Sequence, residues 1–173
     1  MAQEVAIFTG KIFRVTTESV NESLCYERVY QRWGVTVFPI TDEGKVRLLR
    51  KATAENPVPR MRPVSGYIED GEDALTCAKR ELAEEAGLEA ESWSLFTHTE
   101  GEGGLKKRQC FYVASGLRST VCPDHSDMNE SILGDVDLGT RELKLRTLAG
   151  EFGTMTNAFA LLKLIEEWPG LSA

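Results

Sequence analysis

The stretch Gly66–Leu88 constrains this chain most, because it combines a clear helix signal with an unusual set of acids. The run 73–86 contains good helix formers and neither proline nor glycine, so it predicts a helix. Acids at its start, Glu72 and Asp73, suit the positive end of the helix dipole. Gly87 suits the left-handed turn that ends many helices. The sequence therefore predicts a well-bounded helix near the middle of the chain.

Three glutamates of this helix are spaced i, i+3 and i+4 and therefore share one face, namely Glu81, Glu84 and Glu85. Carboxylates held this close repel each other unless cations lie among them. Hard cations such as Mg²⁺ bind through a few carboxylates plus substrate phosphates. A charged helix face is, however, usually no more than a solvated surface. The spacing by itself is compatible with either a divalent-metal site or a solvated face. Arg80 can pair with Glu84, or reach back to Glu72 and hold the preceding loop to the helix.

The whole stretch resembles the Nudix box. That motif reads Gly, five residues, Glu, seven residues, Arg-Glu-aliphatic, one residue, Glu-Glu, one residue, Gly-aliphatic. Every specified position is met, by Gly66, Glu72, Arg80, Glu81, Leu82, Glu84, Glu85, Gly87 and Leu88. Seven fixed residue types match by chance on the order of once in a hundred million start points. The resemblance implies an α/β fold, an α/β/α sandwich with a mixed β-sheet, and a pyrophosphohydrolase, which is a hydrolase acting on phosphorus anhydrides.

The resemblance also implies roles for individual residues. Divalent ions, Mg²⁺ with Mn²⁺ as the alternative, are expected at Glu81, Glu84 and Glu85. A backbone carbonyl of the loop before the helix, at Ser65 or Gly66, would complete the metal site. Such ions offset charge on the phosphates, orient them and lower the pKa of bound water. Supporting residues that hold loop and ligands in place are expected at Glu72 and Arg80.

Segments outside the box resemble the ADP-ribose and nucleoside-diphosphate-sugar pyrophosphatase branch of that family. Members of that branch carry an N-terminal β-rich extension that contributes to a homodimer and to the neighbouring subunit's substrate pocket. The resemblance thus implies a single domain over 1–173, with an extension over about 1–32 and the Nudix core over about 33–173. The expected reaction cleaves the pyrophosphate bond of a nucleoside diphosphate linked to another moiety and releases a nucleoside monophosphate.

Two departures weaken ADP-ribose itself as the substrate. The branch often has a proline beyond the box, whereas 99–104 of this chain contains none. Its Glu-x-Pro-x-Gly approach to the box appears here as Arg62–Gly66, with arginine in place of glutamate. Nucleoside triphosphates or dinucleoside polyphosphates are therefore alternative substrates. A non-catalytic nucleotide-sensing module is a further alternative, although such modules tend to have eroded box acids.

In this branch the general base is often a glutamate in the loop after the last core strand. Glu130 is the candidate here, with Asp124 and Asp127 as competitors, and a solvated loop acid is the alternative interpretation.

Phosphate contacts are expected from a basic cluster before the box, because guanidinium groups match phosphate geometry. Its members are Arg50, Arg60 and Arg62, while Lys106, Lys107 and Arg108 form a second cluster. Both clusters are also consistent with plain surface charge. Trp33, Tyr30 and Phe38 are candidates for stacking on a base or for core packing.

Composition limits the choice of partners and compartment. The net charge of −7 argues against broad binding to nucleic acid or to an anionic membrane. The four cysteines form no Cys-x-x-Cys pair, as expected for reduced thiols in a cytoplasmic protein. No signal peptide or membrane-spanning segment is visible. The expected partners are a small nucleoside diphosphate derivative and a second copy of the chain.

Hydrophobic runs predict the remaining elements. Strands are expected around 5–15, 24–31, 34–40, 45–50, 92–97, 108–114 and 132–138. The pair 34–40 and 45–50 is expected to form a hairpin across the turn 41–44. Helices are expected over 140–150, with Thr140 as the cap, and over 154–168, with Phe159, Leu162 and Ile165 on one face.

Overall fold

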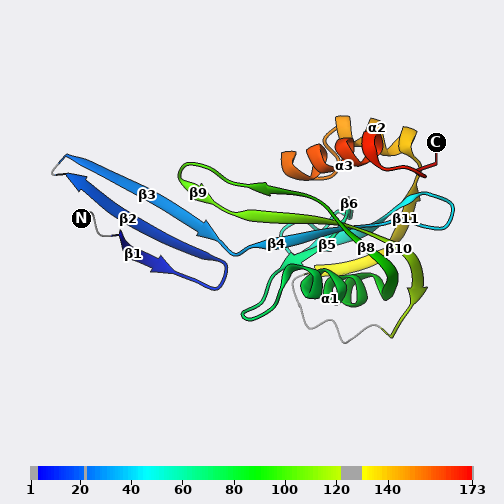
Figure 1. Cartoon of the computed structure of the whole chain (residues 1–173), viewed down its shortest axis with the longest axis horizontal. Coiled ribbons are helices and arrows are strands. Elements are labelled where there is room, and N and C mark those ends of the chain that lie inside the picture. The colour runs from blue at the N-terminus through cyan, green and yellow to red at the C-terminus, as the bar shows by residue number, and fades with distance from the viewer. Residues whose placement is uncertain (1–3, 22, 122–129, 173) are drawn as a thin grey trace.

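The computed structural model describes residues 4–21, 23–121 and 130–172, and of residue 130 only the backbone. Within these residues the elements are β1 (Glu4–Thr9), β2 (Phe13–Asn21), β3 (Leu24–Gln31), β4 (Gly34–Pro39), β5 (Val46–Thr53), β6 (Arg60–Arg62), β7 (Val64–Tyr67), α1 (Ala74–Ala86), β8 (Leu88–Glu100), β9 (Leu105–Lys106), β10 (Arg108–Ser119), β11 (Glu130–Leu138), α2 (Thr140–Leu148) and α3 (Met155–Glu167). Figure 1 shows a layered body, with α1 on one side of the strands and α2 and α3 on the other. This is the predicted α/β sandwich.

Two sheets form the body. The first has the order β7-β4-β10-β8, with β10 parallel to β4 and antiparallel to β8, so it is the predicted mixed sheet. The second has the order β11-β5-β6 and is antiparallel. One core cluster, which includes Phe38, Leu48 and Phe111, packs under α2 and α3. The other, which includes Val35, Leu49 and Val64, packs under α1. β4, whose residues are all buried, is thus covered on both faces.

The box helix forms as predicted. Asp73 caps it, because its carboxylate accepts hydrogen bonds from the backbone N–H groups of Leu75 (2.9 Å) and Thr76 (3.0 Å). Gly87 ends it in the left-handed conformation with φ 61°. The face toward the sheet buries Cys77, Ala78 and Leu82, and Glu81 joins them at the edge of that face. Apolar burial therefore sets the rotation of the helix and with it the direction of its carboxylates.

The predicted hairpin of 34–40 with 45–50 is wrong. β4 and β5 share only one isolated bridge, between Ile40 and Val46, and then enter different sheets. Both strands find longer partners elsewhere, since β4 pairs with β10 and β7 while β5 pairs with β11 and β6. Strand pairing over long sequence distances therefore overrides the local turn signal.

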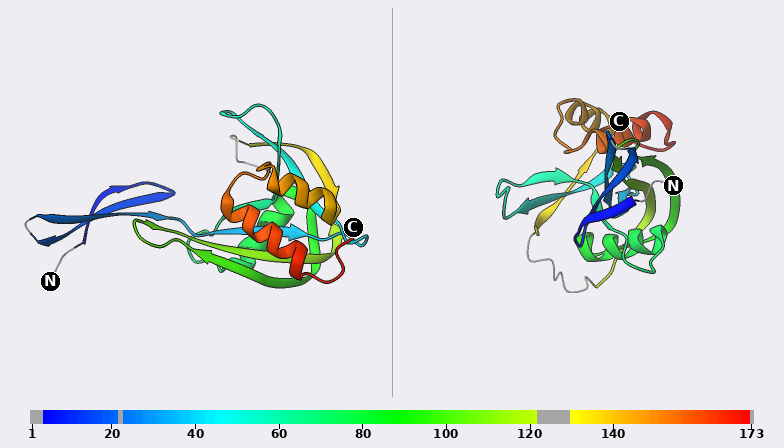
Figure 2. Two further views of the ribbon diagram at one scale, coloured as in Figure 1. Left: turned by 90° about the horizontal axis from the view of Figure 1, so that it is seen from above. Right: turned by 90° about the vertical axis from the view of Figure 1, so that its left-hand side faces the viewer.

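The N-terminal extension consists of β1, β2 and β3, which continue into β9 of the body as one sheet. A single strand over 5–15 is wrong, because residues 10–12 form a turn between β1 and β2. Figures 1 and 2 show this sheet projecting from the body as an arm, with no helix covering either face. The boundary between extension and core near residue 33 stays a prediction.

Two details of the C-terminal helices also differ from expectation. α2 begins after Gly139, which gives no side-chain cap, so Thr140 is the first helical residue and not the cap. In α3 the buried face is Ala160, Leu161 and Leu164, whereas Phe159 is 55% exposed. Helical periodicity over a mixed sequence did not distinguish these two faces. Neither α1, α2 nor α3, the helices in the described part of the chain, is long and apolar enough to cross a membrane.

Candidate active site

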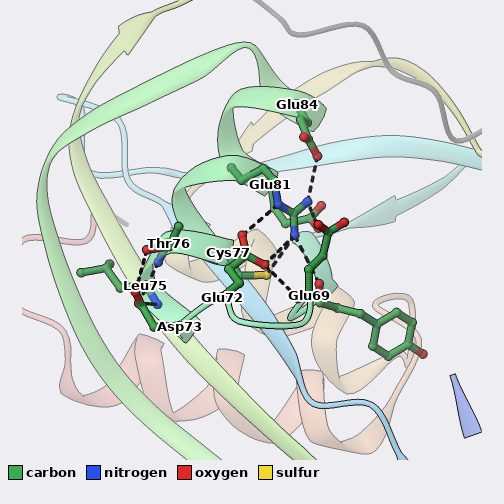
Figure 3. Close-up of polar contacts among 10 residues, drawn as sticks. Glu69, Glu72, Asp73, Leu75, Thr76, Cys77, Glu81 and Glu84 are labelled. Atoms are coloured by element: carbon green, nitrogen blue, oxygen red, sulfur yellow. Dashed lines mark hydrogen bonds and ion pairs between the residues drawn. The ribbon is translucent and has the colours of Figure 1, made fainter. Parts of the chain in front are cut away.

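The carboxylates of the box surround one guanidinium group. Arg80 donates from Nε to Glu72 Oε1 (3.0 Å) and from one terminal nitrogen to both Glu81 Oε1 (2.8 Å) and Glu84 Oε2 (3.0 Å). Figure 3 shows these acids converging, with Glu72 approaching from the loop and Glu81 and Glu84 from α1. The hydrogen bond from Arg80 holds the pKa of Glu72 below its usual range. The sequence allowed Arg80 to pair with Glu72 or with Glu84, and it bonds to both. Its bond to Glu72 ties the loop to the helix.

The loop before α1 is itself closed by Glu72. Its second carboxylate oxygen accepts the backbone N–H of Glu69 at 3.0 Å, and the backbone N–H of Glu72 returns a bond to the Glu69 carbonyl at 3.1 Å. This tight turn fixes the acid within reach of Arg80. Glu72 is therefore a residue that positions the loop and not one that faces the cavity described below.

Glu81 is the most buried of the helix acids, at 8% exposure. Burial raises its pKa to about 7, the charge on Glu85 adds to that rise, and the Arg80 guanidinium opposes it. Additional positive charge beside this carboxyl would favour its ionised form further. Its environment therefore favours cation binding.

Gly66 allows the main chain of β7 to lie directly against Glu81. A Cβ built at this position would fall closer than 3.0 Å to the Glu81 carboxylate, nearer than real Cβ atoms approach other atoms. On the neighbouring residue, the Ser65 backbone N–H donates to Glu85 Oε2 at 3.0 Å. The glycine of the box is thus required by close packing of strand and carboxylate.

Lys51 is a member of the site that the sequence interpretation missed. Its ammonium group donates to Glu85 Oε1, and both side chains are nearly buried, at 6% and 11% exposure. Alternation along β5 places Lys51 on the same face as Leu49, which packs under α1. The expected strand ended at residue 50, whereas β5 continues to Thr53, so Lys51 fell outside the predicted strand and its face was not considered.

The chemistry of these donors fits a divalent ion. As they stand, no three His, Cys, Asp or Glu side chains in the described ranges converge closely enough to hold a metal. Arg80 and Lys51 instead share out the negative charge of Glu81, Glu84 and Glu85. Carboxylate oxygens are nevertheless the ligand type that Mg²⁺ and Mn²⁺ prefer. The main chain at Gly66 lies directly against those of Glu81, because this residue has no Cβ.

Two cavities open next to these carboxylates. The larger has a volume of about 950 Å³ and is lined by Glu81, Glu84 and Glu85 together with Arg32, Tyr67 and Arg108. The smaller has a volume of about 210 Å³ and is lined by Lys51, Arg60 and Arg62 among others. Ser65 and Asn157 line both cavities. The carboxylates thus lie at the side of a nucleotide-sized space that continues into a small basic one.

The first basic cluster is divided by the structure. Arg60 and Arg62 line the smaller cavity, but Arg50 lines neither of the two. Register explains this, because Arg50 pairs with Met61, whose side chain packs into the core under α2 and α3. Arg50 therefore lies on the face of β5 opposite Lys51, and Lys51 takes the place in the cluster that was expected for Arg50.

The structure gives little information on the general-base candidates. Glu130 is the first residue of β11 and pairs with Thr53, and its side chain is not described. Asp124 and Asp127 lie outside the described residues. The identity of the base therefore stays a prediction from the sequence.

The second basic cluster and the aromatic candidates also separate. Lys107 and Arg108 line the larger cavity, and the Arg108 guanidinium lies 5.2 Å from the centre of the exposed Trp33 ring. Phe38 is fully buried in the core, and Tyr30 donates from its hydroxyl to Glu4 at 2.8 Å in the arm. Of the three aromatic candidates, Trp33 has its ring against a cavity-lining residue, whereas Phe38 packs in the core and Tyr30 bonds within the arm.

Comparisons with known proteins agree with this arrangement. A family model described as NUDIX domain matches residues 30–130. The curated Xenopus laevis protein m7GpppN-mRNA hydrolase NUDT17 is 25% identical over 150 residues, which cover 76% of this chain and 51% of that protein. The chain thus spans about half the length of that relative. The crystal structure of an ADP compounds hydrolase matches with a TM-score of 0.77 at 20% identity, covering 96% of this chain and 92% of that one. This last likeness shows a shared fold.

Proposed function

The chain belongs to the NUDIX domain family, and from this premise we propose that it hydrolyses a pyrophosphate bond in a nucleoside diphosphate derivative with the help of a divalent ion. The observation that carries the proposal is that Glu81, Glu84 and Glu85, on one helix face, all line the large cavity, with Glu81 against the main chain at Gly66. Arg80 and Lys51 share the negative charge of these carboxylates, and a divalent ion would add the positive charge that a phosphate substrate also requires. A phosphate substrate supplies the remaining ligands that such a cation needs.

The proposed mechanism assigns distinct tasks to these residues. Glu81, Glu84 and Glu85 hold the ion, with the carbonyl of Ser65 or Gly66 as a further ligand, and Mg²⁺ or Mn²⁺ would offset phosphate charge and lower the pKa of bound water. Arg80 keeps the loop in place through Glu72, and an ion held by the helix acids would compete with it for Glu81 and Glu84. Glu130 is the proposed base, at the start of β11.

The larger cavity supports a nucleotide as the substrate. Its volume of about 950 Å³ suits a nucleoside with a diphosphate, and its lining includes the cations Arg32, Lys107 and Arg108. Arg108 and Tyr67 offer flat groups on which a base can stack. An ADP-ribose-like or nucleotide-sugar substrate follows from the branch resemblance and accords with the ADP compounds hydrolase of similar fold.

A second substrate class has its own support. The curated relative is named as an m7GpppN-mRNA hydrolase, and its substrate is therefore a nucleoside joined through phosphates to another nucleotide. Dinucleoside polyphosphates share that chemistry. They are the alternative substrates of the same site.

The arm supports a homodimer. Val5, Ile7 and Phe8 of β1 are 52%, 59% and 56% exposed, and together they form an apolar surface on the arm. A second copy of the chain would cover them. Light scattering after gel filtration tests this, and Ile7→Glu is expected to convert a dimer into a monomer. A wild-type protein that is already monomeric at micromolar concentration would contradict the dimer without touching the catalytic proposal.

A product assay tests the function directly. Folded protein with Mg²⁺, and separately with Mn²⁺, is incubated with ADP-ribose, nucleotide sugars, dinucleoside polyphosphates and nucleoside triphosphates. We expect release of a nucleoside monophosphate from at least one diphosphate-linked substrate, and at least a hundredfold slower turnover for Glu85→Gln, on the scale of lost electrostatic stabilisation. Faster turnover of nucleoside triphosphates would show that these, and not nucleoside diphosphate derivatives, are the substrate class. Equal inactivity of both proteins on the whole panel would favour a nucleotide-sensing module.

A further inference from the structure

The smaller cavity next to the carboxylates is strongly basic. Its described lining contains Lys51, Arg60 and Arg62 and no acidic side chain, and its other members are neutral. At about 210 Å³ it is smaller than typical cavities for drug-sized ligands. The cavity is therefore suited to a compact anion and not to a second nucleoside.

Strand register turns these three cations toward the same space. Lys51 of β5 pairs directly with Arg60 of β6, and Arg62 pairs with Leu49 two residues before Lys51. Paired residues and residues two apart share a face of the sheet. Like charges opposite one another across two strands are unfavourable by themselves. Lys51 is, however, ion-paired with Glu85, so this face of the sheet combines one cation that already has a carboxylate partner with the two guanidinium groups of Arg60 and Arg62.

The loop between α2 and α3 holds Arg62 in position. One terminal nitrogen of Arg62 donates to the Glu151 carbonyl at 3.3 Å. Gly153 adopts φ +92°, and a Cβ at this glycine would lie 2.6 Å from the same nitrogen. A side chain at 153 would thus displace the guanidinium. The loop consequently presets one of the cations that line the cavity.

The smaller cavity is also continuous with the proposed reaction centre. Lys51 and the Ser65 backbone N–H bind the two oxygens of Glu85, and both residues line the smaller cavity. Ser65 and Asn157 line the larger cavity as well. A diphosphate placed at Glu85 therefore has its nucleoside side in the larger cavity, and its other side directed at Lys51, Arg60 and Arg62.

Building on the proposed function, we propose that this small cavity is an anion subsite that selects substrates whose leaving moiety carries a further phosphoryl group. Three cations around one small space match the several oxygens of a phosphoryl group, and guanidinium groups bind it through paired hydrogen bonds. A neutral sugar in the same place would form no ion pair with these cations. The subsite thus narrows the substrate class from nucleotide sugars in general to phosphorylated ones.

The test compares two substrates that differ in one group, ADP-ribose and ADP-ribose phosphorylated on its terminal ribose. We expect kcat/KM to favour the phosphorylated substrate by about tenfold to a hundredfold, the range for charge-assisted hydrogen bonds. Arg60→Gln and Arg62→Gln should each reduce that preference, mainly by raising KM for the phosphorylated substrate. Arg141→Gln, at an exposed position of α2, is the control and should leave the preference unchanged.

Each outcome has a distinct meaning. Equal kcat/KM for the two substrates, with activity still lost in Glu85→Gln, would overturn the subsite and leave the proposed function standing. UDP-glucose and UDP-glucuronate form a second pair, which differ by a carboxylate. If the carboxylate raises kcat/KM as much as the phosphoryl group does, the subsite selects any anion and the phosphoryl assignment is overturned. If no substrate is hydrolysed, calorimetric binding of ribose 5-phosphate decides. Loss of that binding in Arg62→Gln, but not in Arg141→Gln, would support the subsite, and an absence of binding to wild type would overturn it.

Discussion

Glu81→Gln should stabilise the metal-free protein at neutral and alkaline pH. Burial raises the pKa of Glu81 to about 7 from an ordinary value of 4.5, with the charge of Glu85 as the second cause. The folded state therefore keeps the proton between these values, whereas the unfolded chain loses it. The stability associated with the protonated carboxyl is complete below pH 4.5 and is lost as pH rises through 7.

The magnitude follows from the two pKa values. At about 1.4 kcal/mol per pKa unit, the rise from 4.5 to about 7 corresponds to about 3 kcal/mol of unfolding free energy. For a protein of this size, that is a shift of roughly 6 to 12 °C in Tm. In EDTA, the Tm of Glu81→Gln minus that of wild type should therefore grow by up to this amount between pH 5 and pH 8.

Thermal unfolding followed by circular dichroism measures this difference. Glu84→Gln is the matched control, because Glu84 also bonds to Arg80 but its side chain is 32% exposed against 11% for Glu81. Its Tm difference from wild type should change much less than that of Glu81→Gln over the same pH range, because the charge on Glu84 is only a minor cause of the raised pKa of Glu81. A flat difference for Glu81→Gln, or one that falls as pH rises, would refute the account of a desolvated carboxyl. Carboxylates with lowered pKa, such as Glu72, titrate below this window and cancel in the comparison.

Three further changes test other parts of the site. Gly66→Ala should lower kcat by at least about a hundredfold, because the new methyl group must displace Glu81, and a folded variant with wild-type kcat would contradict the close approach. Lys51→Met should cost about 3 kcal/mol in urea unfolding, since it leaves Glu85 nearly buried without its cation. Lys51→Arg should recover part of that loss, and no difference between the two variants would argue against the ion pair. Leu82→Ala should cost about 2–5 kcal/mol in the same assay, because Leu82 is fully buried under the sheet, and a cost below about 1 kcal/mol would show that the core there relaxes.

Sequence periodicity was enough to predict the box helix and the acids that gather on one of its faces. Side chains at i, i+3 and i+4 are neighbours in any α-helix, whatever surrounds it. Both helix ends were also predictable, since Asp73 and Gly87 act through their own local backbone geometry. A pattern that spans little more than one helix was therefore enough to predict the family and the grouping of the three glutamates.

Strand partners could not be predicted in the same way. β4 and β5 flank an ordinary turn, yet they belong to different sheets, because each finds better pairing with strands far along the chain. The strand expected over 5–15 failed for a related reason, since alternation alone does not show where an exposed arm folds back on itself. Alternation of apolar residues indicates a strand but carries no information about its neighbour.

The sequence by itself thus determined the helix, its caps and the grouping of Glu81, Glu84 and Glu85 on one face, because these depend on contacts within a few residues. The tertiary structure decided which cations contact these glutamates. Lys51 lies 34 residues before Glu85 in the chain and bonds to it only because β5 passes under α1. Register then placed Arg50 on the opposite face, since neighbouring residues of a strand point to opposite sides of a sheet.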